Sequence, residues 1–163
     1  NITQIALRAK FPAQILCLNS QKRFNFAEIF RINYAKIEFL DMETGLSHTS
    51  RLMVAEENTA LALGSGDMLV LATPQMVALM ENAAMMAVRD HLPEGATAVG
   101  SMINTTHVRP TAVGMEVKAT ATLTEAEGRK LTFAVKAEDA NGVVGEGTHI
   151  RYVVDRQKFL SKI

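Results

Sequence analysis

The sequence predicts an α+β protein in which a curved antiparallel sheet wraps around one long central helix. Residues 73–88, TPQMVALMENAAMMAV, form a long apolar segment that opens with the helix-start pair Thr73-Pro74. Four strand-like segments follow it, and short turn sequences separate most of them. Because a lone helix can bury its apolar faces only against the sheet that those strands build, these observations together predict the architecture.

The composition of the 163-residue chain changes near residue 41. Five of the seven Phe lie before residue 42, and the chain beyond it is rich in Ala, Val, Thr, Gly and Met. We therefore expect residues 1–41 to be an N-terminal extension or leader, ordered and partly helical but without catalytic residues. Residues 42–163 would form the functional domain. The alternative is an ordinary N-terminal helix that packs on that domain, since several apolar residues of the segment recur near helical spacing.

The first elements of the domain follow from hydrophobic periodicity. Residues 48–60 partly alternate between apolar and polar and predict a strand. Residues 63–72, LGSGDMLVLA, are interrupted by glycines and predict a loop. The helix is expected to begin with Thr73 as its N-cap and Pro74 at its first helical position, and to run to about His91.

The rest of the domain reads as a four-stranded antiparallel meander. Its strands are predicted over residues 96–108, 114–127, 130–140 and 143–155. The sequences EGRK and ANG are typical of hairpin turns between the last three strands. The final residues, RQKFLSKI, predict a short closing helix.

Composition excludes several classes of partner. Lys plus Arg and Asp plus Glu number 17 each, so the chain has no net charge with which to attract nucleic acid. It has no apolar run of transmembrane length, so we expect no membrane partner. Cys17 is the only cysteine, which fits a reducing cytoplasm. Four His without a close-spaced pair predict no metal site.

Glu81 is the unusual residue of the central helix. At 100° per residue, Gln75, Asn82 and Arg89 recur every seven residues as one polar stripe, and Glu81 lies roughly 80–120° away from it among apolar side chains. A carboxylate there costs free energy unless it is paired or keeps its proton. Two interpretations stay open: an exposed or salt-bridged residue bordering solvent or a subunit interface, and a catalytic carboxylate that faces a cleft.

The other candidates also have ordinary explanations. His107, in SMINTTHVRP, and His149, in GEGTHIRY, fall in predicted strands, where a His is more often structural or exposed than catalytic. Thr73 is first of all a predicted helix cap. Its hydroxyl would also lie at the positive end of the helix, where a developing anion is stabilised.

Three stretches together resemble one known family. They are LATPQMVALMENAA, VGSMINTTHVRPTAVG and EGRKLTFAVKAEDANGVVGEGTHIRYVV. From about Ser47 onwards, the chain resembles the hotdog-fold thioesterase superfamily, and most closely its fluoroacetyl-CoA thioesterase-like group. The resemblance implies a hotdog fold over residues 42–163 and hydrolysis of an acyl-CoA thioester.

The resemblance also implies roles for particular residues. Thr73, Glu81 and His107 match the catalytic positions of the group, and Gly100 and Arg151 match positions that contact substrate. Coenzyme A would be part of the substrate, with no cofactor and no metal. Proteins of this superfamily are typically dimers with sites at the subunit interface, so we expect a homodimer or higher homo-oligomer in which Glu81 works beside groups of the other chain.

One departure from the group concerns the acyl group. The fluoroacetate-specific enzyme has a Phe in a lid ahead of its helix, whereas residues 57–74 of this chain, ENTALALGSGDMLVLATP, contain none. We therefore expect another small or medium acyl group. A hotdog hydratase would need Asp and His near the helix start, which TPQMVALME lacks. A non-catalytic acyl-CoA-binding or regulatory module stays open as the alternative.

Overall fold

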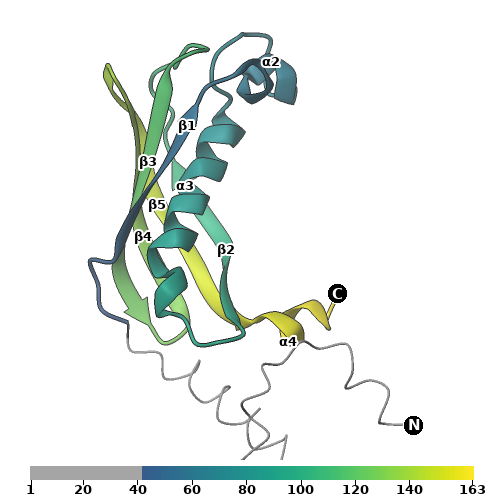
Figure 1. Ribbon diagram of the computed structural model, residues 1–163, viewed down its shortest axis with the longest axis vertical. Coiled ribbons are helices and arrows are strands. Elements are labelled where there is room, and N and C mark those ends of the chain that lie inside the picture. The colour runs from purple at the N-terminus through teal and green to yellow at the C-terminus, as the bar shows by residue number, and fades with distance from the viewer. Residues whose placement is uncertain (1–41) are drawn as a thin grey trace, which may run out of the picture.

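The computed structural model describes residues 42–163. The expectations for residues 1–41 lie outside the described residues. The described part contains one curved antiparallel sheet with a long helix against one of its faces, as predicted (Figure 1).

The sheet has five strands in the spatial order β1-β3-β4-β5-β2, and each neighbouring pair is antiparallel. The strands are β1 (Ser47–Met53), β2 (Ala96–Thr105), β3 (Glu116–Glu127), β4 (Lys130–Asp139) and β5 (Gly142–Asp155). The four later strands were thus predicted close to their observed bounds, and the hairpin turns between β3, β4 and β5 are confirmed.

The predicted four-stranded meander is wrong in one pairing. β2 pairs with β5 at one edge of the sheet, while β3 pairs with β1 at the other side. The connection between β2 and β3, residues 106–115, is too long for a tight hairpin turn, so nothing local forces those two strands together. Only the last three strands form a meander.

The long helix α3 (Thr73–Val88) continues into a 3₁₀ turn, η4 (Arg89–His91), which confirms the predicted extent. Its N-cap, however, is Ala72 and not Thr73. The Ala72 carbonyl accepts from the backbone N–H groups of Gln75 and Met76 at 3.0 Å each. Thr73 is therefore the first helical residue and Pro74 the second, and the Thr73 hydroxyl makes no capping bond.

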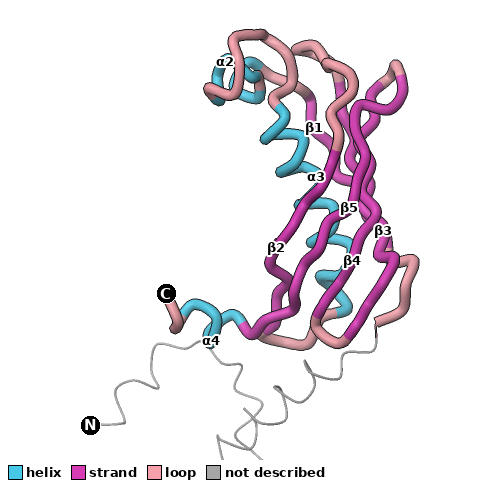
Figure 2. The backbone as a smooth tube through the Cα atoms, turned by 180° about the vertical axis from the view of Figure 1, so that it is seen from behind, coloured by secondary structure: helices cyan, strands magenta, loops and turns pink. Residues whose placement is uncertain are grey.

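The predicted strand over residues 48–60 is too long. β1 ends at Met53, and a 3₁₀ turn, η3 (Glu56–Asn58), and the short helix α2 (Ala60–Leu63) follow. The reason is local, because Thr59 caps α2 by accepting from the Ala62 N–H at 3.3 Å. α2 lies beyond the N-terminal end of α3 (Figure 2).

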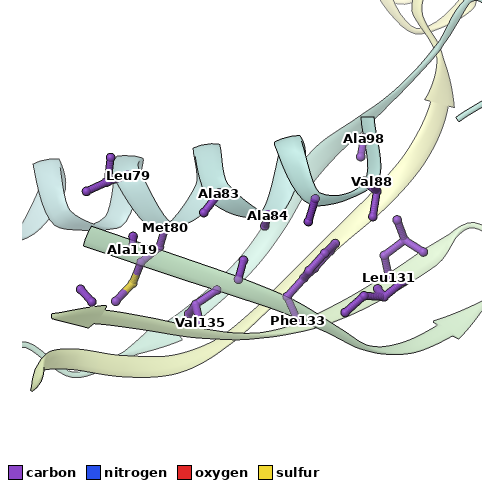
Figure 3. Packing of buried hydrophobic residues seen from close by; sticks show 14 of the residues in the cluster. Leu79, Met80, Ala83, Ala84, Val88, Ala98, Ala119, Leu131, Phe133 and Val135 are labelled. Atoms are coloured by element: carbon purple, nitrogen blue, oxygen red, sulfur yellow. The ribbon is translucent and has the colours of Figure 1, made fainter. Parts of the chain in front are cut away.

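The core fills the space between α3 and the concave side of the sheet. Met80, Ala83 and Ala84 of α3 point toward Phe133 and Val135 of β4 (Figure 3), and all five are at most 2% exposed. The small alanines let the helix approach the sheet closely, and the methionines fill the remaining space. Met76 and Met80 are both 0% exposed.

β5 approaches β2 closely at Gly147. An added Cβ at this residue would lie 2.0 Å from the backbone oxygen of Asn104 and 2.6 Å from the Cα of Thr105. Only glycine fits there without moving the backbone of the neighbouring strand. A register shift between Gly100 and Met102 also bulges β2 at Ser101.

The chain ends in the short helix α4 (Arg156–Leu160), which confirms the predicted closing helix. Asp155 caps it, since its side chain accepts from the Lys158 N–H at 2.9 Å. No helix within residues 42–163 is both long and apolar enough to cross a membrane.

Candidate active site

Thr73 and His107 form a hydrogen-bonded pair at the start of α3. The Thr73 hydroxyl oxygen lies 2.8 Å from His107 Nδ1. His107 follows the end of β2, so it belongs to the connecting loop and not to the strand that the sequence predicted. Its other ring nitrogen, Nε2, is buried and has no hydrogen-bond partner among the described residues. The pair thus combines a hydroxyl with an imidazole whose Nε2 makes no hydrogen bond to the described residues.

A cleft opens beside this pair. It has a volume of about 240 Å³, and its lining comes from α2 with the loop that leads to α3, the first residue of α3, and the loop that carries His107. The lining residues are Ala60, Ser65, Val70, Leu71, Thr73, His107, Val108, Arg109 and Pro110. Five of these residues are apolar and four are polar or charged, so the walls offer both kinds of contact to a small molecule.

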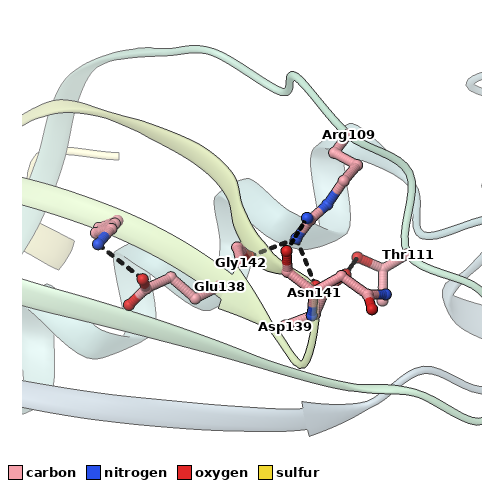
Figure 4. A network of polar contacts seen from close by, with 7 residues as sticks. Arg109, Thr111, Glu138, Asp139, Asn141 and Gly142 are labelled. Carbon is pink, nitrogen blue, oxygen red and sulfur yellow. Dashed lines mark hydrogen bonds and ion pairs between the residues drawn. The ribbon is translucent and has the colours of Figure 1, made fainter.

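The loop that carries His107 is fastened to the β4–β5 turn by a polar network (Figure 4). Arg109 Nη2 lies 2.5 Å from a carboxylate oxygen of Asp139, and Arg109 also donates to the backbone oxygens of Asn141 and Gly142. The Thr111 hydroxyl donates to the other Asp139 oxygen at 2.9 Å. The Asp139 side chain is fully buried, whereas that of Arg109 is 31% exposed, so the ion pair is buried on its carboxylate side.

A second polar group surrounds Glu81, in the middle of α3. Its side chain is 42% exposed, and Oε1 lies 3.9 Å from Nε2 of the buried His149 on β5. Arg151, two residues further along β5, lies 3.0 Å from the same Nε2 through Nη1. Glu81 is thus neither fully exposed nor in a surface salt bridge, and the misplaced carboxylate faces strands β2 and β5.

Gly100 on β2 makes room for the Glu81 carboxylate. An added Cβ at Gly100 would lie 2.8 Å from Glu81 Oε1 and 3.2 Å from His149 Cε1. The first distance is too short for a carbon atom beside an oxygen, so any larger residue would displace the carboxylate. The family resemblance implied that Gly100 contacts substrate, and the structure places it against Glu81.

Arg151 lies inside the molecule. It is 7% exposed, and its Nη2 donates to the Ala98 carbonyl at 2.6 Å, while Nη1 donates to the Glu81 carbonyl at 3.4 Å. Its Nε is buried without a partner among the described residues. Burial lowers the pKa of Arg151, and the charge of Glu81 opposes that change.

Burial also lowers the pKa of His149, and the positive charge of Arg151 acts in the same direction. The hydrogen bond to the Met102 carbonyl and the charge of Glu81 oppose the change. His149 is 0% exposed. Sequence reasoning treated this His as structural or exposed and did not connect it with the site. The available signal was its spacing from Arg151, because residues i and i+2 of a strand share one face.

The structure brings the predicted residues together in two groups. Thr73 and His107 form one, and Glu81, Gly100 and Arg151 form the other. Eight residues separate Thr73 from Glu81, which is about 12 Å along a helix axis. No group of three or more His, Cys, Asp or Glu within residues 42–163 is arranged to hold a metal ion.

Comparisons with known proteins agree on one family. The family model described as FlK, fluoroacetyl-CoA-specific thioesterase, matches residues 54–157. The curated fluoroacetyl-CoA thioesterase of Streptantibioticus cattleyicolor is 40% identical over 94 residues, which cover 58% of this chain and 68% of that protein.

Solved structures extend the comparison. A structure of the fluoroacetyl-CoA thioesterase FlK is 35% identical, with a TM-score of 0.70 over 74% of this chain and 94% of that one. A Thermus thermophilus member of the thioesterase superfamily is 25% identical, with a TM-score of 0.70 over 76% of this chain and 92% of that one. A hot-dog-like protein from Thermanaerovibrio acidaminovorans, 23% identical with a TM-score of 0.68 over 74% and 90%, supports the hotdog fold alone.

Proposed function

Because the chain belongs to the family of fluoroacetyl-CoA-specific thioesterases, we propose that it hydrolyses a small or medium acyl-CoA thioester through Thr73, Glu81 and His107. The observation that carries the proposal is the position of the Glu81 carboxylate. It is half exposed in front of Gly100, His149 and Arg151, on the same helix that begins with the Thr73–His107 pair. A carboxylate held in this way is available to a substrate.

Glu81 would promote attack on the thioester in one of two ways. As a general base, it takes a proton from the water that attacks the thioester carbonyl carbon. As a nucleophile, its carboxylate oxygen attacks that carbon and forms an anhydride that water then hydrolyses. In both routes the carbon–sulfur bond breaks, and coenzyme A leaves as a thiolate that takes up a proton.

Thr73 and His107 would act on the carbonyl group or on the leaving sulfur of the thioester. His107 polarises the carbonyl or supplies the proton to the leaving sulfur, and the Thr73 hydroxyl fixes the orientation of its ring. A backbone N–H near Gly100 is a candidate donor to the oxyanion. Arg151 would act as a buried positive charge behind Glu81. No cofactor or metal takes part, so hydrolysis should survive exhaustive treatment with a chelator.

We also infer a homodimer with composite sites. Thr73 and Glu81 lie too far apart on α3 to contact each other, and Glu81 is open to groups from outside the chain. β2 is an edge strand and carries Met102, which is 40% exposed. Light scattering coupled to size exclusion tests this, since a fully active monomer would contradict it.

The single cysteine of the sequence fits a cytoplasmic location, which fractionation of cells would test.

The acyl group would differ from fluoroacetyl. The segment ahead of α3, residues 57–74, contains no Phe, and its exposed large side chains include Leu61, Met68 and Leu69. A panel of acyl-CoA thioesters that varies in chain length would identify the preferred class.

The decisive experiment measures release of free thiol from that panel by the wild type, Glu81→Gln and Glu81→Ala at equal folded concentration. We expect both variants to lose hydrolysis by about 10²-fold or more. Asp90→Asn is the matched control, because Asp90 is an exposed carboxylate just after α3, and it should keep wild-type rates. A wild type that binds CoA esters saturably but releases no thiol would favour the alternative, a non-catalytic acyl-CoA-binding module.

A further inference from the structure

His149 has both ring nitrogens assigned by their neighbours. Nδ1 lies 2.8 Å from the backbone oxygen of Met102, which can only accept, so Nδ1 must carry the hydrogen. Nε2 lies 3.0 Å from Arg151 Nη1, which can only donate, so Nε2 must accept. The contacts therefore fix a neutral ring in a single tautomer. A second hydrogen on Nε2 would point at the N–H of a cation.

Arg151 depends on this ring for part of its position. Its guanidinium reaches three backbone or side-chain acceptors on different elements: Ala98 on β2, the Glu81 carbonyl on α3, and His149 on β5. The bond to Glu81 is the longest of the three, at 3.4 Å. Because Arg151 is 7% exposed, water cannot easily replace an acceptor that is lost.

The side chains of His149 and Arg151 lie close to the Glu81 carboxylate beside Gly100. The Cβ position of an added side chain at Gly100 would lie 2.8 Å from Glu81 Oε1, 3.2 Å from His149 Cε1 and 3.7 Å from Arg151 Nη1. His149 Nε2 is 3.9 Å from the same carboxylate oxygen, while no direct ion pair joins Arg151 to it among the described contacts. His149 Nε2 is thus close to both groups, 3.0 Å from Nη1 of the cation and 3.9 Å from the carboxylate oxygen.

We propose that His149 is a positioning residue, which accepts a hydrogen bond from Arg151 and so holds that cation behind Glu81 in the orientation that hydrolysis requires. His149 carries no proton in the reaction and differs in this from His107. The inference rests on the proposed catalytic role of Glu81. It assigns a function to a histidine that the family resemblance left without one.

The first test compares His149→Phe with His149→Gln in the full chain. Phe fills the ring volume beside Phe133, whose ring centroid lies 6.4 Å from that of His149, but offers no acceptor. Gln is neutral and offers an amide oxygen to Arg151. We expect His149→Phe to lower kcat by about 10²-fold with little change in KM, and His149→Gln to recover to within about tenfold of wild type.

Two further readouts separate positioning from proton transfer and from a merely structural role. The pH profile of kcat/KM for His149→Gln should keep every limb of the wild-type profile. In an Arg151→Met background, His149→Phe should cause little additional loss, because the two residues act as one unit. A limb that disappears in His149→Gln, or full additivity of the two losses, overturns the proposal.

NMR of the isotope-labelled wild type tests the tautomer without any turnover. We expect the His149 ring to show hydrogen on Nδ1 alone at neutral pH, and a doubly protonated ring would overturn the proposal.

If Glu81→Gln abolishes hydrolysis while His149→Phe leaves kcat unchanged, this inference fails and the proposed function stands. If the wild type hydrolyses no acyl-CoA, the proposed function fails instead, and the catalytic part of this inference fails with it. If His149→Phe does not fold, the pH profile of His149→Gln and the NMR spectrum decide.

Discussion

His107 Nδ1 lies 2.8 Å from the hydroxyl of Thr73, although 34 residues separate the two in the sequence. The bond exists because Thr73 is not the N-cap of α3, a position that Ala72 takes. A capping hydroxyl would be directed at the helix backbone, whereas this one is available to the loop that follows β2. The start of the helix and the candidate catalytic His are thereby tied together.

Replacing Thr73 tests whether its hydroxyl serves the reaction or the helix. Thr73→Val removes the hydroxyl and keeps the shape, and we expect hydrolysis to fall by about 10²-fold. Thr73→Ser keeps the hydroxyl and should retain most activity. Thermal unfolding of both should stay close to wild type, because Ala72 accepts the first helical bonds. A large loss of thermal stability in Thr73→Val would instead indicate a structural role.

Gly100→Ala tests the space beside Glu81. The added methyl would lie 2.8 Å from Glu81 Oε1 and 3.2 Å from His149 Cε1, so the carboxylate must move. We expect kcat to fall by about 10²-fold while the protein remains folded. Ser101→Ala, at the next residue of β2, is the control because the Ser101 side chain donates to the Ile150 carbonyl on an exposed surface. Unchanged kcat in Gly100→Ala would show that the position of Glu81 is not critical.

The network around Asp139 should contribute to stability. Asp139→Ala removes the acceptor of the Thr111 hydroxyl and of the Asn141 N–H, and it removes the carboxylate partner of Arg109, which keeps only its two backbone acceptors. We expect a loss of about 3 kcal/mol in the free energy of unfolding. Glu138→Ala is the matched control on the adjacent residue. Its ion pair with Lys136 is about half exposed, so it should change stability by less than about 1 kcal/mol. Denaturant unfolding measures both, and equal losses would contradict the prediction.

The stability of the protein should fall in acid partly because of His149. Burial holds its pKa in the native state below the ordinary value of 6.5, whereas the unfolded chain titrates near that value. Below about pH 6.5 the unfolded state therefore binds more protons than the native state, and the free energy of unfolding falls as the pH falls toward the lowered pKa. The contribution is fully present above about pH 6.5.

Denaturant unfolding between about pH 8 and about pH 5 measures this dependence. His149→Gln should reduce the slope, because Gln does not titrate. An identical slope in wild type and His149→Gln would show that His149 is not responsible.

Much of the fold could be predicted from the sequence, because periodicity and turn residues act locally. The helix over 73–91 and the last three strands follow directly from such signals. The pairing of β2 with β5 could not be predicted, since it depends on where the connection over residues 106–115 crosses the end of the sheet. The end of β1 at Met53 was also missed, because the cap at Thr59 was counted as part of a strand.

The candidate site was only partly visible in the sequence. The helical wheel separated Glu81 from the polar stripe, and the family resemblance added Thr73, His107, Gly100 and Arg151. The division of these residues into two groups depends on three-dimensional packing. The roles of His149 and Arg109 were missed because their partners, Met102 and Asp139, are distant in sequence and include backbone atoms.

The contact between Gly147 and the backbone of Asn104 limits the substitutions that this protein can accept during evolution. Every other amino acid at residue 147 would push β2 away from β5, and β2 leads directly into the loop that carries His107. Natural variation and laboratory libraries alike should find no improved variants at this residue. New acyl preferences should arise instead from the segment ahead of α3, where Met68 and Leu69 are exposed.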